Sequence, residues 1–572
     1  ESNDRSDLTH VGRFVPVYPL SGQIHQRSIR SLVRKALNMM SDNVEDYLPA
    51  EIVNKANLIE LKNAIKQYHY PETLEDYNNA RKRIVFDEFF MHQCAWLLKR
   101  KEYNELKNSY KIRVSWDFID SFFQSLSFTP TQSQLDVIRE IAKDLNNTVP
   151  MARLLQGEVG SGKTLVAVVS ALAVIESNYK SAIMAPTEIL AEQHYISTLE
   201  MFDSVIKISP FHSKLKIKGL SKEISIGLFL GSMPEKIKQE MRKSIKEGVY
   251  DFLIGTHTLI QDNIKIPDLG LSIIDEQHRF GVLQRAAIKS GEKYYPHSLT
   301  MSATPIPRTL ALTAYGDLDL SEINEMPFGE RNVKTKLISP DRIKAAYNHL
   351  KNEIDKGRQV IVICPLIEES EKLNSSSAEK VYSNLQNTIF PKYNIGLLHG
   401  RLNLDLKEEV MKNFRNGDIN ILVSTTVIEV GVDVPNASVM MIQSADRFGL
   451  SQLHQLRGRV GRGKYEGYCI LVSDNENEHT QERLKIFERM SSGIELANED
   501  LKIRGEGDIT HTRQSGVPLF KVADLIQDKE TQELSRKMAE YYVIDNFDEF
   551  TKNNLLFKKV QMIKEQMEGK LN

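Results

Sequence analysis

The chain has 572 residues, which at roughly 100–200 residues per domain predicts about three or four domains. Hydrophobic residues make up 41% and charged residues 26%, as in ordinary globular proteins, and no apolar run approaches the ~18 residues that span a membrane. Lys and Arg (74) nearly balance Asp and Glu (76), which excludes a histone-like polycation but leaves room for a local basic groove that binds nucleic acid. The first residues lack a secretory signal, and Cys94, Cys364 and Cys469 form no C-x-x-C pair, so a cytoplasmic protein without disulfides or a thiolate zinc site is expected.

Residues 1–110 are predicted to be mostly helical, because apolar residues recur at helical spacing from Ile29 to Met40 and again over 83–101. The prolines of the segment 15–19 favour an extended connector before the first helix. Aromatic residues of the second run are expected in the core rather than on a ligand platform: Phe86, Phe89, Phe90 and Trp96. The chain begins at Glu1 rather than at a methionine, so upstream residues are expected to be removed or missing.

From about residue 150 onward, short β-rich apolar runs alternate with helical patterns, which is typical of parallel α/β sheets. The runs form two series, separated near 327–332: 181–186, 252–255, 271–274 and 298–302, then 359–364, 394–398, 420–423, 439–442 and 468–472. We therefore expect a helical N-terminal region (1–110), two tandem α/β domains (111–330 and 331–490), and a C-terminal region (491–572) with a Gly- and Arg-bearing loop and Lys-rich helices.

The segment Gly157-Glu-Val-Gly-Ser-Gly-Lys-Thr164 matches the phosphate-binding pattern G-x-x-x-x-G-K-T in full. It lies between a short apolar strand and an apolar helix, where glycines let backbone N–H groups face phosphate at a helix N-terminus. Lys163 is expected to reach the β- and γ-phosphates, and Thr164 Oγ1 to hold Mg²⁺. The predicted cofactors are ATP and Mg²⁺, and the expected nucleotide-binding residues are Gly157, Glu158, Val159, Gly160, Ser161, Gly162, Lys163 and Thr164. The complete motif in this context disfavours a chance Gly-rich turn.

A second site is needed for hydrolysis, and the segment 271–278 supplies candidates for it. An apolar strand delivers Asp275 to its carboxyl end, where it can bind Mg²⁺, and Glu276 is placed to orient or deprotonate the attacking water. Alone, such an acidic pair would more often be a solvated turn. The complete phosphate-binding loop about 110 residues upstream favours the catalytic interpretation.

The third element is the segment 455–462, Gln-Leu-Arg-Gly-Arg-Val-Gly-Arg. Charge that builds on the transferred γ-phosphoryl favours a guanidinium supplied from another surface. Arg459 and Arg462, in the second α/β domain, are therefore expected to supply it, and Gln455 of the same segment is also expected to be catalytic. On its own, this run would more often be a basic patch for a phosphate backbone.

These three motifs, with Ser302-Ala-Thr304 between the second and third, resemble those of superfamily 2 helicases. Phe128 and Gln134 resemble an adenine-reading Q motif, and 185–188, 255–257 and 425–433 resemble motifs Ia, Ic and V. The resemblance implies nucleotide contacts by Phe128, Gln134, Gly431 and Asp433. It implies coupling or DNA contacts by Pro186, Thr187, Thr256, His257, Ser302, Thr304 and Thr425.

Longer segments resemble the RecG family of branch-migrating DNA helicases: 274–285, 302–310, 364–371 and 427–463. The segments 500–505 and 512–516 also resemble that family's translocation motif, in which Arg513 and Gln514 would turn domain closure into movement along duplex DNA. The resemblance implies two RecA-like motor domains acting on double-stranded and branched DNA, such as stalled forks and Holliday junctions, in recombination and repair. It also implies a monomer that has single-stranded-DNA-binding protein as a partner.

The chain departs from the family pattern at two places. Family members carry an N-terminal wedge domain with an OB fold, and this sequence starts near the point where that domain ends. The family usually has Gly-Pro-Gly at 505–507 and glycine at 511, whereas this chain has Glu506 and His511. A differently shaped translocation loop is therefore expected.

Several other classes compete with this interpretation. A duplex translocase that couples transcription to repair shares the translocation motif, but the DEQH sequence at 275–278 and the run at 364–371 favour RecG. An RNA helicase would lack the 512–516 loop, and a transporter-type ATPase would need an LSGGQ sequence, which does not occur. A DNA-binding scaffold without catalysis is disfavoured by the intact Lys163, Asp275, Glu276 and Arg462.

Overall fold

The chain forms two compact units in the computed structural model. The described parts of residues 1–106 and 504–572 make up the smaller unit, and those of 107–307 and 318–503 the larger one. The structure describes every residue except 1–13, 20–24, 41–43, 107, 218–219, 221, 257, 262–263, 276–293, 303–317, 328–332, 366–370, 401, 403, 426–433, 462, 464, 505–519, 526 and 570–572. In this described part, no helix is both long enough and apolar enough to cross a membrane.

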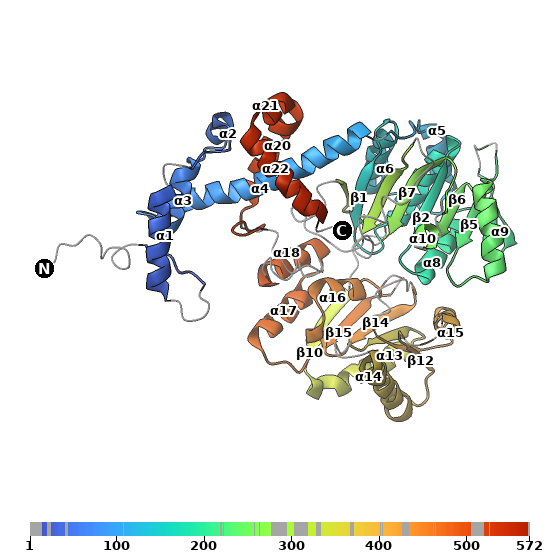
Figure 1. Cartoon of the computed structure of the whole chain (residues 1–572). Coiled ribbons are helices and arrows are strands. Elements are labelled where there is room, and N and C mark those ends of the chain that lie inside the picture. Colours follow the sequence, from blue (N-terminus) through green and yellow to red (C-terminus); the bar gives the residue numbers. More distant parts are fainter. Residues whose placement is uncertain are drawn as a thin grey trace. The chain divides into compact units, whose positions relative to one another are not determined.

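The first sheet of the larger unit has the strand order β3-β4-β5-β6-β2-β7-β8-β1-β9 within the described residues. All neighbouring strands pair in parallel except β3–β4 and β4–β5. The strands are β1 (Ala152–Gly157), β2 (Lys180–Met184), β3 (Val205–Ser209), β4 (His212–Leu215), β5 (Ile224–Phe229), β6 (Phe252–Gly255), β7 (Leu269–Asp275), β8 (His297–Ser302) and β9 (Asp319–Ile323). The associated helices are α5 (Trp116–Ser125), α6 (Gln132–Leu145), α7 (Lys163–Glu176), α8 (Glu188–Glu200), α9 (Glu235–Lys246) and α10 (Thr258–Gln261) (Figure 1).

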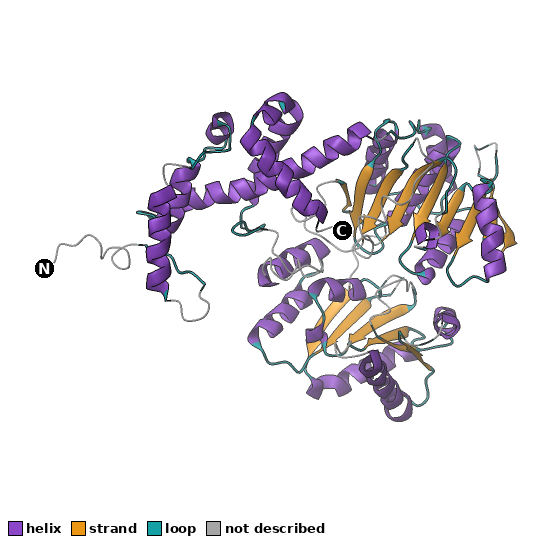
Figure 2. Ribbon diagram, in the orientation of Figure 1, coloured by secondary structure: helices purple, strands orange, loops and turns teal. Residues whose placement is uncertain are grey.

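The second sheet is parallel throughout, in the order β10-β15-β14-β11-β13-β12. Its strands are β10 (Val333–Ile338), β11 (Gln359–Ile363), β12 (Ile395–Leu398), β13 (Ile421–Ser424), β14 (Ala437–Ile442) and β15 (Gly467–Val472). Helices flank this sheet as they do the first (Figure 2). They are α13 (Ile343–Asp355), α14 (Glu371–Asn384), α15 (Leu404–Asn416), α16 (Leu450–Arg457), α17 (Glu478–Arg489) and α18 (Gly493–Arg504), with short turns η3 (Pro340–Arg342), η4 (Leu385–Ile389) and η6 (Ala445–Arg447).

The two series of apolar runs thus form two parallel-stranded α/β domains, as the sequence predicted. The central strands need no polar face because helices cover both sides, and β2, β5, β7, β11 and β14 are accordingly almost entirely buried. The apolar helix α7, with eleven consecutive buried residues from Leu165 to Ile175, packs inside the core of the first domain.

The smaller unit is helical and combines both ends of the chain. Its helices are α1 (Gln26–Met40), α2 (Ala50–Lys55), α3 (Leu61–His69), α4 (Leu74–Leu106), α20 (Lys529–Glu540), α21 (Phe547–Lys552) and α22 (Asn554–Gly569), with the turn η8 (Tyr541–Asp545). The prediction that its aromatic residues are core residues is confirmed, since Phe86 and Phe90 of α4 are buried with Phe550 and Leu556. The domain boundaries expected from the sequence remain predictions, and the structure adds that the first and last segments share one core.

Polar contacts fix the segment 520–528 on α4. The carboxylate of Glu88 accepts hydrogen bonds from three successive backbone N–H groups, those of Lys521, Val522 and Ala523, at 3.0, 3.0 and 2.8 Å. Arg81 forms a bidentate pair with Asp528 at 2.5 and 2.8 Å. Charge-assisted and bidentate hydrogen bonds are the stronger and more directional kind, so this segment is held in a defined position on α4.

A buried histidine ties the segment before α5 to the first sheet. His297 Nδ1 accepts a hydrogen bond from Met151 N at 3.0 Å, which leaves Nε2–H to donate to Tyr110 O at 2.8 Å. This pattern requires a neutral imidazole, and burial lowers the pKa of His297 to about 4. Because the pKa of His297 is lower in the folded chain than in the unfolded chain, the neutral ring contributes its full stability above the unfolded pKa. That stability is lost as the pH falls through the folded pKa.

We therefore predict that the free energy of unfolding of the wild-type chain falls by about 3 kcal/mol more than that of His297→Gln between pH 7 and pH 4. The glutamine keeps a donor and an acceptor but does not titrate. Urea unfolding at a series of pH values, followed by circular dichroism, measures the difference. Identical pH profiles for the two proteins would show that His297 is not the titrating group.

Candidate ATP-binding site

The strand order places several of the predicted catalytic residues at one edge of the first sheet. β7, β8 and β1 are neighbours and all run parallel, so their carboxyl ends meet at the same edge. The glycine-rich loop follows β1, Asp275 is the last residue of β7, and Ser302 is the last residue of β8. Asp275 pairs in register with Met301, and Gln156 with Ser302, which brings the loop and the carboxylate to the same level.

The glycine-rich loop has the backbone shape that its glycines allow. Gly160 and Gly162 both have φ of +85°, and Gly162 is the left-handed N-cap of α7. A side chain on Gly157 would also lie 2.5 Å from Ser161 Oγ. Lys163, the first residue of α7, donates from Nζ to the carbonyls of Gly157 and Glu158 at 2.7 and 2.9 Å. Its ammonium group is thus folded back over the loop whose N–H groups would face phosphate.

Gln134 of α6 is held against this loop. Its amide closes a capping box with Thr131, and Nε2 donates to Ser161 O at 2.8 Å. A Cβ at Gly162 would lie 2.2 Å from Gln134 Nε2, so the close approach depends on glycine. Phe128 is half-buried and packs on the core of the first domain. The structure therefore brings Gln134 to the loop, while adenine contact by either residue stays a prediction.

Asp275 has a partner that the sequence analysis missed. His194 Nε2 lies 2.7 Å from Asp275 Oδ2, and both side chains are largely buried. His194 stands on α8, 81 residues before Asp275, and no spacing rule connects a helix residue to a later strand end. Pro186 and Thr187 precede the same helix, and the Thr187 side chain caps it by accepting from Leu190 N at 3.4 Å.

Two further coupling candidates lie at strand ends. Thr256 follows β6, is buried, and its hydroxyl lies 2.9 Å from that of Thr258. Thr425 follows β13 in the second sheet and is also buried. Thr164, the second residue of α7, is half-buried at the mouth of the loop. The following predicted residues lie outside the described part of the chain: His257, Glu276, Thr304, Gly431, Asp433, Arg462, Arg513 and Gln514.

The second domain contributes α16 and the turn after it. Gln455 is half-buried on α16, and Arg459 is half-buried in the turn. Between them Arg457 is buried, and its guanidinium donates to the carbonyls of Phe487, Met490 and Ser491. Burial lowers the pKa of Arg457 below the usual range for arginine. Arg457 thus anchors the turn that leads from α17 into α18.

Glu158 of the glycine-rich loop reaches these elements within the same unit. Its Oε1 accepts a hydrogen bond from Gly493 N, the first residue of α18, at 2.8 Å, and lies 3.8 Å from His454 Nε2. A carboxylate at a helix N-terminus is stabilised by the unpaired N–H groups there. The sequence predicted Glu158 only as a member of the loop, because its partners are more than 290 residues away.

Comparison with known proteins agrees with this geometry. The DEAD/DEAH box helicase model matches residues 129–313, and the helicase conserved C-terminal domain model matches 341–464. Two tandem RecA-like parallel sheets, with a phosphate-binding loop and an acidic strand end on the first, define an ATP-dependent helicase motor.

The particular family follows from longer matches. The model for domain 3, C-terminal, of the ATP-dependent DNA helicase RecG matches residues 490–568. The chain is 42% identical to the ATP-dependent DNA helicases RecG of Synechocystis sp. and Bacillus subtilis, over 99% and 92% of its length and 66% and 74% of theirs. A structure of RecG bound to a three-way DNA junction superposes with a TM-score of 0.69 at 39% identity, over 91% of this chain and 66% of that one. The chain belongs to the RecG family of ATP-dependent DNA helicases, and spans about two thirds to three quarters of the length of these relatives.

We predict that Gly162→Ala weakens ATP binding at least tenfold, because the new Cβ meets Gln134 Nε2 and strains a residue at φ +85°. Gly357→Ala is the matched control, since Gly357 has φ of +80° and open space around it. Both variants should lose about 1 kcal/mol of stability from the backbone strain. Isothermal titration with a non-hydrolysable ATP analogue measures the affinity, and an equal loss in both variants would contradict a specific role for the contact with Gln134.

Proposed function

We propose that this chain uses ATP hydrolysis to move along double-stranded DNA and to remodel branched DNA, such as stalled forks and Holliday junctions, in recombination and repair. The observation that carries the proposal is the glycine-rich loop on β1 beside Asp275 on β7, in a chain 42% identical to RecG helicases over nearly its whole length. A relative with the same fold is bound to a three-way DNA junction, which supports branched DNA as the substrate.

The catalytic roles we propose follow from the sequence motifs and, for the described residues, are supported by where the side chains lie. Lys163 and the loop N–H groups bind the β- and γ-phosphates, and Phe128 and Gln134 contact adenine. The Thr164 hydroxyl and the Asp275 carboxylate offer the oxygen donors that Mg²⁺ prefers, and the ion would neutralise charge on the phosphates. Glu276 orients the attacking water, and Gln455, Arg459 and Arg462, with Gly431 and Asp433, act on the phosphates from the second domain. His194 is proposed as a positioning residue that holds the Asp275 carboxylate.

We propose a coupling role for residues of the remaining helicase motifs. Some of these residues would pass the change between the ATP-bound and ADP-bound states to the DNA contacts: Pro186, Thr187, Thr256, His257, Ser302, Thr304 and Thr425. Arg513 and Gln514 would convert that change into movement along DNA. The connectivity supports the last step, because residues 505–519 join α18 to the segment that Glu88 and Arg81 fix on α4. A nucleotide can shift a two-state element only if it binds the two states with different affinities.

The partners and location proposed are those of a DNA motor. We propose that the chain acts as a monomer in the cytoplasm and meets single-stranded-DNA-binding protein at forks. Its three cysteines are all free and buried, which suits a reducing compartment.

We predict that Lys163→Ala lowers DNA-stimulated ATP hydrolysis at least 100-fold without unfolding the chain, because the ammonium stabilises charge on the transferred phosphoryl group. Phosphate release is measured with forked, linear duplex and single-stranded DNA side by side. Lys246→Ala, at the end of α9, is the control and should behave as wild type. If Lys163→Ala hydrolysed ATP within a few-fold of the wild-type rate, the assignment of the loop as the ATP-binding site would be wrong. If no DNA stimulated hydrolysis by the wild-type chain, the proposed motor function would be wrong.

We predict that Arg513→Ala keeps most of the DNA-stimulated ATPase activity and loses junction unwinding, since it removes the link between domain closure and movement. Gln514→Ala should have the same effect more weakly. Arg415→Ala, an exposed arginine at the end of α15, is the charge-matched control. Parallel loss of ATPase and unwinding in Arg513→Ala would indicate a role in folding or DNA binding instead.

A further inference from the structure

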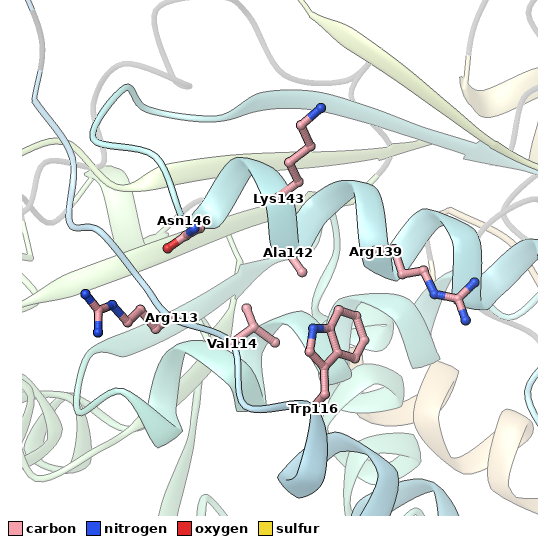
Figure 3. Close-up of a pocket in the computed structure, with 7 residues that line it drawn as sticks. All are labelled: Arg113, Val114, Trp116, Arg139, Ala142, Lys143 and Asn146. Carbon is pink, nitrogen blue, oxygen red and sulfur yellow. The ribbon is translucent and has the colours of Figure 1, made fainter.

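A cationic hollow of about 450 Å³ lies on the first domain between α6 and the segment that leads into α5. Its lining includes three cationic side chains, Arg113, Arg139 and Lys143, and the apolar groups of Val114, Trp116 and Ala142 (Figure 3). In this view Arg113 and Arg139 lie on opposite sides of the Trp116 indole, and the Lys143 side chain extends away from it.

The hollow is separate from the ATP-binding site. The N-terminal turn of α6 contacts the glycine-rich loop through Gln134, whereas Arg139, Ala142 and Lys143 line the hollow from the later turns of the same helix. The helix has 14 residues and is therefore ~21 Å long, at 1.5 Å per residue. The last turn of α6 leads through residues 146–151 into the start of β1. The hollow therefore lies toward the amino end of β1, and the glycine-rich loop lies at its carboxyl end.

The cations of the hollow are available to an anionic ligand. In the described part of the chain, the side chains of Arg113 and Lys143 form no ion pair. Arg139 pairs with Asp136, and both of those side chains are 57% exposed, so that pair is weak. Lys111 is exposed two residues before Arg113, while Ile112 between them is buried, and the segment therefore presents its cations outward.

Trp116 is a large apolar side chain left at the surface. It is 41% exposed, although Phe118 and Phe122 of the same helix are buried in the core and Phe123 is partly buried against it. Ser115 caps that helix, which fixes where the indole emerges. An exposed indole among cations offers a flat apolar face for stacking beside groups that bind phosphate.

We propose that this hollow binds a single-stranded stretch of DNA, with an unpaired base stacked on Trp116 and its flanking phosphates held by Arg113, Lys143 and Arg139. A paired base has no free face to stack, so duplex DNA could use only the cations. An acidic peptide would likewise use only the cations and would leave the indole face unused. The site is a second DNA contact, outside the motor's nucleotide site and not required for the function proposed above.

The chain has only two tryptophans, and Trp96 is 6% exposed, so the fluorescence of Trp116 can be used to detect a ligand that binds in the hollow. The Trp96→Phe variant is titrated, without ATP, with an oligo-dT of about 12 nucleotides, a size within the range of known single-strand sites. We expect quenching of more than half of the Trp116 fluorescence by stacking, and an affinity that falls steeply with salt. Arg113→Glu in that background should weaken binding at least tenfold, because it reverses a charge on an extended segment without touching a helix.

Several controls separate this site from other causes. Lys236→Glu, an exposed lysine on α9, is the charge-matched control and should leave the titration unchanged. ATP hydrolysis without DNA should be the same in Arg113→Glu and wild type. If Trp96→Phe does not fold, the difference in quenching between wild type and Trp116→Phe carries the same information. No saturable quenching, or no effect of Arg113→Glu, would overturn the proposal, and so would equal quenching by a duplex or by poly-glutamate. Because the titration needs no hydrolysis, it can succeed or fail independently of the motor function.

Discussion

The parallel pairing of β1, β8 and β7 is the constraint on which the candidate site depends. Parallel strands that lie side by side end at one edge of the sheet, so the loop after β1 and the carboxylate after β7 must lie close together. A shift of one residue would turn every side chain of a strand to its other face and move Asp275 away from the loop. Strands buried on both faces resist such a shift, because it would expose or overpack the core.

The glycine-rich loop is also where several other elements meet. Gln134 reaches it from α6, and its own Glu158 reaches the first residue of α18. Lys163 Nζ meanwhile donates hydrogen bonds to the carbonyl oxygens of Gly157 and Glu158. A nucleotide that draws the Lys163 ammonium toward its phosphates must break these two hydrogen bonds. Glu158 O would then lose one hydrogen bond and keep the one from Ser161 N, at 3.0 Å, and the carboxylate that caps α18 belongs to the same residue.

The features of the fold and site that could be predicted from the sequence are those that depend on contiguous residues and on hydrophobic periodicity. The loop, the strand that ends at Asp275, the apolar α7 and the two parallel sheets all follow from local patterns. Contacts between side chains that are far apart in the sequence produce no such local pattern. His194 meets Asp275 across 81 residues, and Arg457 holds three carbonyls that carry no side-chain signal. Arg83 heads a run expected to be an ordinary amphipathic helix, yet it is fully buried and paired with Asp46 and Asp87. A charge can be buried in this way only where partners surround it, and only the fold shows that they do.

The two ends of the chain are joined in the smaller unit by specific polar and aromatic contacts. Glu88 holds three successive N–H groups directly after residues 505–519, and Arg81 holds Asp528 a few residues on. The same stretch packs Phe520 against Phe89 of α4. The segment 520–528 is therefore fixed to a helix of 33 residues, and the N-terminus of α18 contacts the glycine-rich loop through Glu158. α18 and the segment 520–528, the described elements on either side of 505–519, are therefore each held by partners within their own unit.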